Sequence, residues 1–179
     1  MEFRVLGPVE AREDGQELPL GGPKQRVLLA LLLLRANETV SRDQLIDGLW
    51  GEHPPRSAAH TLDSQVSRMR KTLGEGRLLT RAPGYLLRVE PGELDLDRFE
   101  RLYRRGHEAV IRGAASEAAD ALRSALALWR GPALANVLYE PLGSSEAERL
   151  EERRLLALED RIDADLELGR CVREPPAQV

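Results

Sequence analysis

The sequence has few of the residues on which most catalytic and metal sites depend. A single cysteine, Cys171, excludes a disulfide within the chain and a zinc site built from several thiolates. The three histidines, His53, His60 and His107, are far apart. The sequence also lacks a glycine-rich phosphate loop, a Ser–His–Asp arrangement and a metal-ligand spacing. These absences argue against an enzyme, and we expect no cofactor and no metal.

Long hydrophobic runs and targeting signals are missing as well. The longest apolar run, Val27–Leu34, is far shorter than the ~20 residues that span a bilayer. The N-terminus, MEFRVLGPVE, does not show the basic-then-apolar pattern of a secretory signal. The chain has 179 residues, of which 42% are hydrophobic and 31% are charged. This length and composition predict one domain of medium size or two small domains. We therefore expect a cytoplasmic, nucleoid-associated protein that does not contact a membrane.

Charge is distributed unevenly along the chain, although its net value is only −4. Between His53 and Val89, seven Lys and Arg residues stand against two acids. From Asp97 to the end, 13 Lys and Arg residues stand against 16 acids. A basic segment inside an acidic chain indicates that this segment meets a polyanion.

The first half predicts a strand pair, three helices and a hairpin. Phe3 and Val5, then Leu18 and Leu20 after a turn, indicate the strand pair. A mostly buried helix is expected over 24–35, a second after the N-cap Ser41, and a third over 58–73. Strands near 78–80 and 85–89 flank a turn. This order is that of a winged helix-turn-helix, whose second helix enters the major groove.

The helix over 58–73, with the sequence AAHTLDSQVSRMRKTL, has two unlike faces. Leu62, Val66, Met69 and Leu73 form an apolar stripe, and short hydroxyls and cations lie opposite. From this face we predict base contacts by Thr61, Ser64, Gln65, Ser67 and Arg68. Phosphate or minor-groove contacts are predicted for Lys24, Arg56, His60, Arg70, Lys71 and Arg81. The alternative is a solvated surface helix, with Arg70 pairing only with its neighbours.

Several stretches resemble a known family. QVSRMRK (65–71) and LTRAPGY (79–85) look like the recognition helix and wing of OmpR-type DNA-binding domains. MEFRVLGPV, PKQRV (23–27), SRDQL (41–45) with LWG (49–51), and ALALWRGPAL (125–134) resemble the Streptomyces antibiotic regulatory protein family of transcription activators. No receiver domain precedes Phe3, so we expect no phosphoacceptor aspartate, as in small members of that family.

The resemblance implies a set of partners. Family members bind direct repeats in double-stranded promoter DNA, often side by side, and contact the sigma factor and other subunits of RNA polymerase. The loop 51–56 matches the segment that OmpR-type activators turn toward polymerase. We therefore assign a polymerase contact to Trp50, Gly51, Glu52 and His53, although core packing is the alternative for Trp50. Pairing of two copies is also expected.

The second half predicts a helix pair followed by a long helix. Helical spacing is expected over 97–112, 116–129 and 145–168, which resembles one tetratricopeptide unit and part of a shortened bacterial transcriptional activation domain. Leu150, Leu155, Leu158, Ile162 and Leu166 form a stripe that we expect to pack on the pair or on a second copy. The predicted fold is mainly α with a small antiparallel β component. Its parts are a winged-helix DNA-binding domain (1–92), an all-α tetratricopeptide-like domain (97–170) and a disordered tail (171–179).

Two functions fit these features. The first is a DNA-binding transcription activator, for which the family resemblance implies a secondary-metabolite (antibiotic) gene cluster as the target. The alternative is a regulator that acts through protein contacts, or an antagonist of a full-length activator. The basic face separates the two, because an adaptor does not need Arg68 and Arg81 whereas DNA binding does.

Overall fold

Two small antiparallel sheets and six helices form the computed structural model, which describes residues 1–137 and 143–169. The first sheet contains β1 (Glu2–Arg4), β2 (Glu10–Glu13) and β3 (Gln16–Glu17) in that order. The second has the order β4-β6-β5, with β4 (Thr39–Ser41), β5 (Leu78–Arg81) and β6 (Gly84–Leu87). The helices are α1 (Pro23–Leu33), α2 (Arg42–Trp50), α3 (Ala58–Leu73), α4 (Asp95–Ile111), α5 (Ala115–Leu126) and α6 (Gly143–Glu167).

The N-terminal lobe, which contains α1 to α3 and the second sheet, is a winged helix-turn-helix, as the sequence predicts. The helix α1 is buried almost all round, which fits its VLLALLLL run. Ser41 caps α2 in a reciprocal capping box with Gln44, as expected. The strand β4 was not predicted, because three residues are too short to show an alternation and their partner β6 lies far along the chain. This strand joins the hairpin to the helices.

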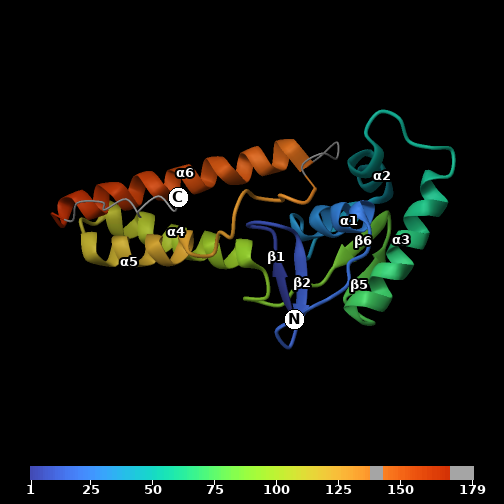
Figure 1. Cartoon of the computed structure of the whole chain (residues 1–179), viewed down its shortest axis with the longest axis horizontal. Helices are drawn as coiled ribbons and strands as arrows, with labels where there is room; N and C mark the ends of the chain where they lie inside the picture. The colour runs from blue at the N-terminus through green and yellow to red at the C-terminus, as the bar shows by residue number, and fades with distance from the viewer. Residues whose placement is uncertain (138–142, 170–179) are drawn as a thin grey trace, which may run out of the picture.

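The C-terminal lobe contains α4 to α6, and in it α6 packs on the antiparallel pair α4 and α5 (Figure 1). Gly106 of α4 faces Leu122 of α5 so closely that an added Cβ would lie 2.5 Å from Leu122 Cγ. Phe99 stacks on Tyr103 and meets Trp129 edge-on, with ring centroids 6.1 and 5.5 Å apart. This pair of helices with a small residue at the crossing fits the tetratricopeptide-like prediction.

The first sheet lies between the two lobes and is bound to the C-terminal one (Figure 1). The buried Asp95 carboxylate, at the start of α4, accepts hydrogen bonds from the N–H groups of Val5 (2.9 Å) and Leu6 (3.0 Å). Burial raises the pKa of Asp95, and the hydrogen bonds oppose that rise. The backbone N–H of Arg130 also donates to the Leu6 carbonyl. The strands β1 to β3, which the sequence assigns to the domain 1–92, thus contact both lobes. One hydrophobic core runs through the two lobes.

The buried side of α6 differs from the predicted stripe. Leu150 is buried, but the other residues of α6 that line the core are Ala147, Ala157 and Ala164. Leu155 and Leu166 of the predicted stripe are exposed. At these two positions the expected packing on the helix pair is wrong, because small residues let α6 approach its neighbours closely, so the alanines face inward. The alternative, packing on a second copy, stays a prediction. The predicted tail 171–179 lies outside the described residues.

No helix within residues 1–137 and 143–169 is long and apolar enough to cross a membrane. Over the same residues, no cluster of His, Cys, Asp and Glu side chains has an arrangement that holds a metal ion.

Candidate nucleic-acid interface

The outward face of α3 is the centre of the candidate site. The apolar stripe of α3 is buried in the core, at Leu62, Val66, Met69 and Leu73. His60, Ser67, Arg68 and Lys71 are exposed on the other side, and Thr61 and Ser64 are half-buried beside them. The Ser64 hydroxyl donates to the His60 carbonyl, which keeps that side chain close to the helix surface. The exposed face is therefore short and cationic.

The single acid of α3, Asp63, is bound by two neighbours, of which Arg42 balances its charge. Arg42 donates a hydrogen bond to Asp63 Oδ1 at 2.6 Å, and the Tyr85 hydroxyl donates to the same atom at 2.7 Å. The hydrogen bond from Arg42, followed by that from Tyr85, lowers the pKa of Asp63 to about 2. The network joins α3 to α2 and β6, and it reduces the negative potential that Asp63 adds to a face expected to meet phosphate.

A second contact fixes α3 to the hairpin of β5 and β6. Arg70 donates through Nε to the Leu78 carbonyl (2.9 Å) and through Nη2 to Thr80 Oγ1 (2.7 Å). Its guanidinium carbon lies 5.9 Å from the centre of the Tyr85 ring. These contacts match the alternative stated for Arg70, pairing within the protein. Its phosphate contact stays a prediction and requires Arg70 to leave these partners.

Gln65, a predicted base reader, is held on the inner side of α3. The side-chain amide of the buried Gln25 donates to Gln65 Oε1 at 2.7 Å and to the Gln65 carbonyl at 3.1 Å. Gln65 is half-buried and links α3 to the start of α1. Reading a base through Gln65 Oε1 therefore requires Gln65 to give up the bond from Gln25.

Five other cationic or titratable side chains that the sequence selects are exposed: Arg56, His60, Arg68, Lys71 and Arg81. Within residues 1–137 and 143–169, their side chains make no hydrogen bond or ion pair to another residue. Arg81 ends β5 and pairs in register with Gly84, which places it beside the hairpin turn. These groups can therefore turn toward a phosphate or a base without breaking an internal contact.

The predicted polymerase loop follows α2 and leads into α3. Glu52 and His53 are exposed in it, and Trp50 is half-buried at the end of α2. Lys24 donates to the Leu49 carbonyl and lies 5.9 Å from the Trp50 ring centre. Lys24, predicted as a phosphate contact, is thus engaged at the C-terminal end of α2, where a cation is favourable.

Sequence reasoning missed the residues that orient α3, namely Gln25, Arg42 and Tyr85. One signal was available for Arg42. It occupies the first position of α2, where the helix dipole disfavours a cation, so a compensating carboxylate was to be expected. Gln25 and Tyr85 stand in patterns that indicate only a helix and a strand.

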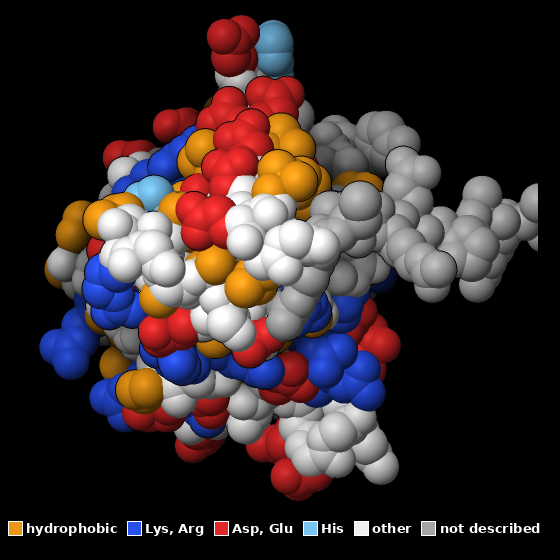
Figure 2. All heavy atoms as spheres, turned by 90° about the vertical axis from the view of Figure 1, so that its left-hand side faces the viewer, with side chains coloured by type: hydrophobic (Ala, Val, Ile, Leu, Met, Phe, Trp, Pro, Cys, Tyr) orange, Lys and Arg blue, Asp and Glu red, His pale blue; other side chains and the backbone are white. Residues whose placement is uncertain are grey.

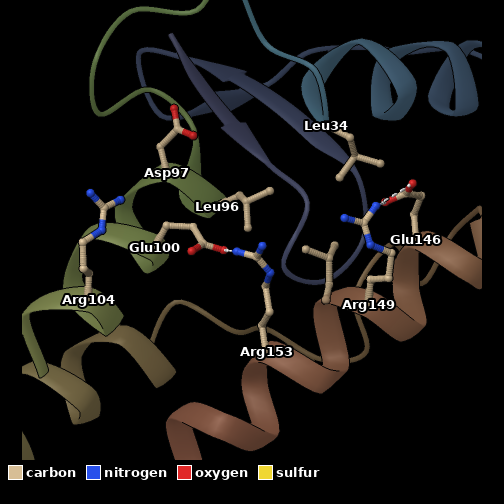
Figure 3. Close-up of a pocket in the computed structure, with 9 residues that line it drawn as sticks. Leu34, Leu96, Asp97, Glu100, Arg104, Glu146, Arg149 and Arg153 are labelled. Atoms are coloured by element: carbon tan, nitrogen blue, oxygen red, sulfur yellow. Dashed lines mark hydrogen bonds and ion pairs between the residues drawn. The ribbon is translucent and has the colours of Figure 1, made fainter. Parts of the chain in front are cut away.

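A groove of about 430 Å³ lies at the junction of the two lobes (Figure 3). Leu34, Leu96 and Leu150 supply its apolar part, and three acids and three arginines surround them. Two arginines are already paired, Arg153 with Glu100 and Arg149 with Glu146, the latter at 3.0 Å. With its formal charges balanced, the lining does not select an anion or a cation.

The two lobes match two known families. Residues 15–87 match "Transcriptional regulatory protein, C terminal", and residues 94–174 match "Bacterial transcriptional activator domain". The regulatory protein AfsR of Streptomyces coelicolor is 44% identical over 170 residues, which is 94% of this chain and 17% of AfsR. The regulatory protein DnrI of Streptomyces peucetius is 39% identical over 181 residues, covering 95% of this chain and 66% of DnrI.

A solved structure agrees with the fold. Mycobacterium tuberculosis EmbR, solved in complex with a low-affinity phosphopeptide, matches with a TM-score of 0.90 and 35% identity. The match covers 94% of this chain and 46% of the EmbR chain. The chain thus spans between about a sixth and two thirds of the length of these relatives.

Proposed function

The chain belongs to the Streptomyces antibiotic regulatory protein family of transcription regulators, and from this membership we propose that it activates transcription by binding promoter DNA through α3 and the β5–β6 hairpin. The matched families are regulators and not enzymes. One observation carries the proposal. Arg68, Lys71 and Arg81 are exposed and their side chains have no hydrogen-bond or ion-pair partner among the residues that the structure describes, while the acid of α3, Asp63, is bound by Arg42 and Tyr85.

The binding mode follows from the chemistry of the exposed face. The helix α3 enters the major groove, where Arg68 donates two hydrogen bonds to a guanine and the hydroxyls of Thr61, Ser64 and Ser67 contact base edges. Lys71, Arg56 and His60 bind phosphates and set the position of the helix. Arg81 reaches the neighbouring minor groove, where the negative potential favours a guanidinium.

Partners beyond DNA are part of the same proposal. Two copies bind side by side on direct repeats, and the exposed residues Glu52 and His53 lie in a loop that meets RNA polymerase. Membership of the Streptomyces antibiotic regulatory protein family supports a target in a secondary-metabolite gene cluster.

The test is a fluorescence-anisotropy titration of tiled promoter-region duplexes at about 50 and 200 mM salt. The double variant Arg68→Ala/Arg81→Ala removes two cations from the interface. Arg101→Ala/Arg104→Ala removes two exposed cations from α4 and serves as the matched control. We expect site-selective, salt-sensitive binding that the first variant loses and the control keeps.

Two results would count against this function. Equal losses in the two variants would mean that only net charge matters. Absent binding, or binding that Arg68 and Arg81 do not affect, would favour the regulator that works through protein contacts. Transcription from the bound promoter then separates an activator from a blocker.

A further inference from the structure

The buried side chain of Gln25 holds the amide of Gln65 in one orientation. Gln25 stands in the first turn of α1 and is 7% exposed. Its Nε2 lies 3.1 Å from the Gln65 carbonyl oxygen and 2.7 Å from Gln65 Oε1. A side-chain amide nitrogen carries two hydrogens, so Gln25 has one for each of these oxygens. The residue that it holds is one that we predict to read a base.

The two contacts determine which end of the Gln65 amide meets Gln25. A backbone carbonyl oxygen can only accept a hydrogen bond, so the Gln25 atom beside it must be the nitrogen. That nitrogen can only donate, so the Gln65 side-chain atom at 2.7 Å must be the oxygen. Exchanging oxygen and nitrogen in one or both amides would place two donors or two acceptors face to face. The orientation of the Gln65 amide thus follows from the backbone of α3.

The Gln65 side chain consequently has only donors left for DNA. Its Oε1 faces the buried Gln25, whereas its Nε2 makes no hydrogen bond to any residue that the structure describes. Thr61, four residues earlier, and Arg68, three residues later, lie on the same side of α3. A free glutamine reads adenine by accepting from N6 while it donates to N7. Gln65 lacks the available acceptor that this pairing needs.

The charge distribution brings DNA to the part of the molecule where this amide lies. The helix α3 lies at one end of the molecule (Figure 1), and the opposite end displays a column of acidic side chains (Figure 2). Acidic side chains repel phosphates, so that end does not compete with α3 for a duplex. The donors of Gln65 Nε2, beside the exposed Arg68, therefore meet base edges when α3 enters the major groove.

We propose that Gln25 is a positioning residue that sets the base preference of α3. It turns the Gln65 amide so that Nε2 donates to guanine, which offers acceptors at O6 and N7, and not to adenine, which presents a donor at N6. The inference rests on the proposed function, because it names the chemistry of one contact within the same interface. Gln25 itself stays buried and acts on the base through Gln65.

The test measures the affinity of the intact chain for duplexes with each of the four base pairs at every position of a bound site. Gln65→Ala locates the contact, as the position at which the base preference becomes flat. There we expect the parent chain to prefer guanine over adenine by about fivefold or more. Gln25→Met has a similar length but no donor, so it should lose most of this preference. Gln16→Met makes the same change at an exposed position of β3 and should keep it.

Two further variants keep the test valid if Gln25→Met folds poorly. Gln65→Glu has no side-chain N–H, so one oxygen accepts from Gln25 and the other faces the base. Its preference at the same base pair should reverse toward adenine, whose N6 donates. The double variant Gln25→Met/Gln65→Ala should show the same flat preference as Gln65→Ala alone, because Gln25 acts only through Gln65.

The orientation can also be measured without DNA. In NMR spectra of the free chain, the side-chain amide hydrogens of Gln25 should exchange with water about tenfold or more slowly than those of Gln65. The reason is that the Gln25 hydrogens are bonded and buried, whereas the Gln65 hydrogens face solvent.

The outcomes separate this inference from the function on which it rests. Slower exchange at Gln65 than at Gln25, a preference for adenine in the parent chain, or no position that Gln65→Ala flattens would overturn the orientation. A Gln25→Met variant that weakens every duplex alike and keeps the guanine preference would overturn the positioning role. In each case, selective binding that needs Arg68 and Arg81 leaves the proposed function intact. A chain that binds no duplex selectively would overturn that function and this base preference with it.

Discussion

Arg68 and Lys71 stand three residues apart on α3, both exposed and both cationic, yet the proposed interface gives them different tasks. A side chain that reads a base affects one sequence more than others, whereas a phosphate contact affects all sequences alike. Arg70, between them, is already bound to Leu78 and Thr80 of the hairpin. Within the described part of the chain, the cations of α3 thus divide into two whose side chains have no internal hydrogen-bond or ion-pair partner and one that fixes the helix.

Alanine substitutions at the two exposed positions separate these tasks. Arg68→Ala should cost about 1–3 kcal/mol at the specific site and relax the base preference there. Lys71→Ala should weaken every sequence and lower the slope of log K against log salt by roughly one. Titrations of specific and random duplexes at several salt concentrations measure both. Equal losses on the two duplexes for Arg68→Ala would contradict its assignment as a base reader.

Asp63 gives the stability of the chain a dependence on pH. Because its folded-state pKa of about 2 lies below the unfolded value of 3.8, its stabilisation is present above pH 4 and is lost as the pH falls toward 2. Half of its side chain is exposed, so we expect at most about 1 kcal/mol. Urea unfolding of the wild type and Asp63→Asn at pH 7 and pH 3 measures this. The difference between them should shrink at pH 3, and a constant difference would refute the role of its ionisation.

At the scale of the element, the hairpin owes its position to β4. Val40 and Ser41 of β4 pair with Tyr85 and Gly84 of β6, so the hairpin is attached to the helix-turn-helix by backbone hydrogen bonds. Gly84 lies so close to β4 that an added Cβ would stand 1.9 Å from the Val40 carbonyl oxygen and 2.8 Å from Ser41 Cα. Both neighbours are backbone atoms, which a rotamer change cannot move away.

Gly84→Ala should therefore separate β6 from β4 and destabilise the chain by about 3 kcal/mol or more. Thermal unfolding followed by circular dichroism measures the loss. Gly22→Ala is the control, since nothing lies within 4 Å of its added Cβ and its φ is negative, and it should cost less than about 1 kcal/mol. Similar midpoints for Gly84→Ala and Gly22→Ala would show that β4 and β6 are not tightly paired.

At the scale of the whole molecule, the N-terminal strands couple the two lobes. Asp95 accepts from Val5 and Leu6, and Arg130 donates to Glu10 at 2.8 Å and to the Pro8 carbonyl at 3.0 Å. The two tryptophans report on different lobes, Trp50 at the end of α2 and Trp129 after α5. Because one core runs through both lobes, we expect them to unfold together.

Asp95→Ala should break this coupling. It leaves the buried N–H groups of Val5 and Leu6 without their acceptor, which costs about 2–4 kcal/mol. Fluorescence unfolding of Trp50→Phe and Trp129→Phe chains should give coincident curves with Asp95 present and separate curves with Asp95→Ala. Asp97→Ala, an exposed position two residues later, should leave the curves coincident. Separate curves in the parent chain would mean that the lobes are independent.

Prediction from the sequence succeeded where the pattern was local. The span of α3, the capping box at Ser41 and the two hairpin strands all follow from periodicity, capping and turn residues within a few positions. The candidate face of α3 followed from the same periodicity, and its exposed cations lie where expected. The roles assigned to those cations remain predictions.

What the sequence by itself determined is the order of the helices and of the hairpin strands, the winged helix followed by a helical domain, and the family, because periodicity, caps and motifs depend on neighbouring residues. Only the tertiary structure decided which polar groups hold α3, since Asp63 meets Arg42 and Tyr85 from other elements. The same holds for Asp95 and the first sheet. The tertiary structure also decided that alanines of α6 face the core while Leu155 and Leu166 face water. The reason is that the close approach of a neighbouring helix, and not hydrophobicity alone, selects the buried side of α6.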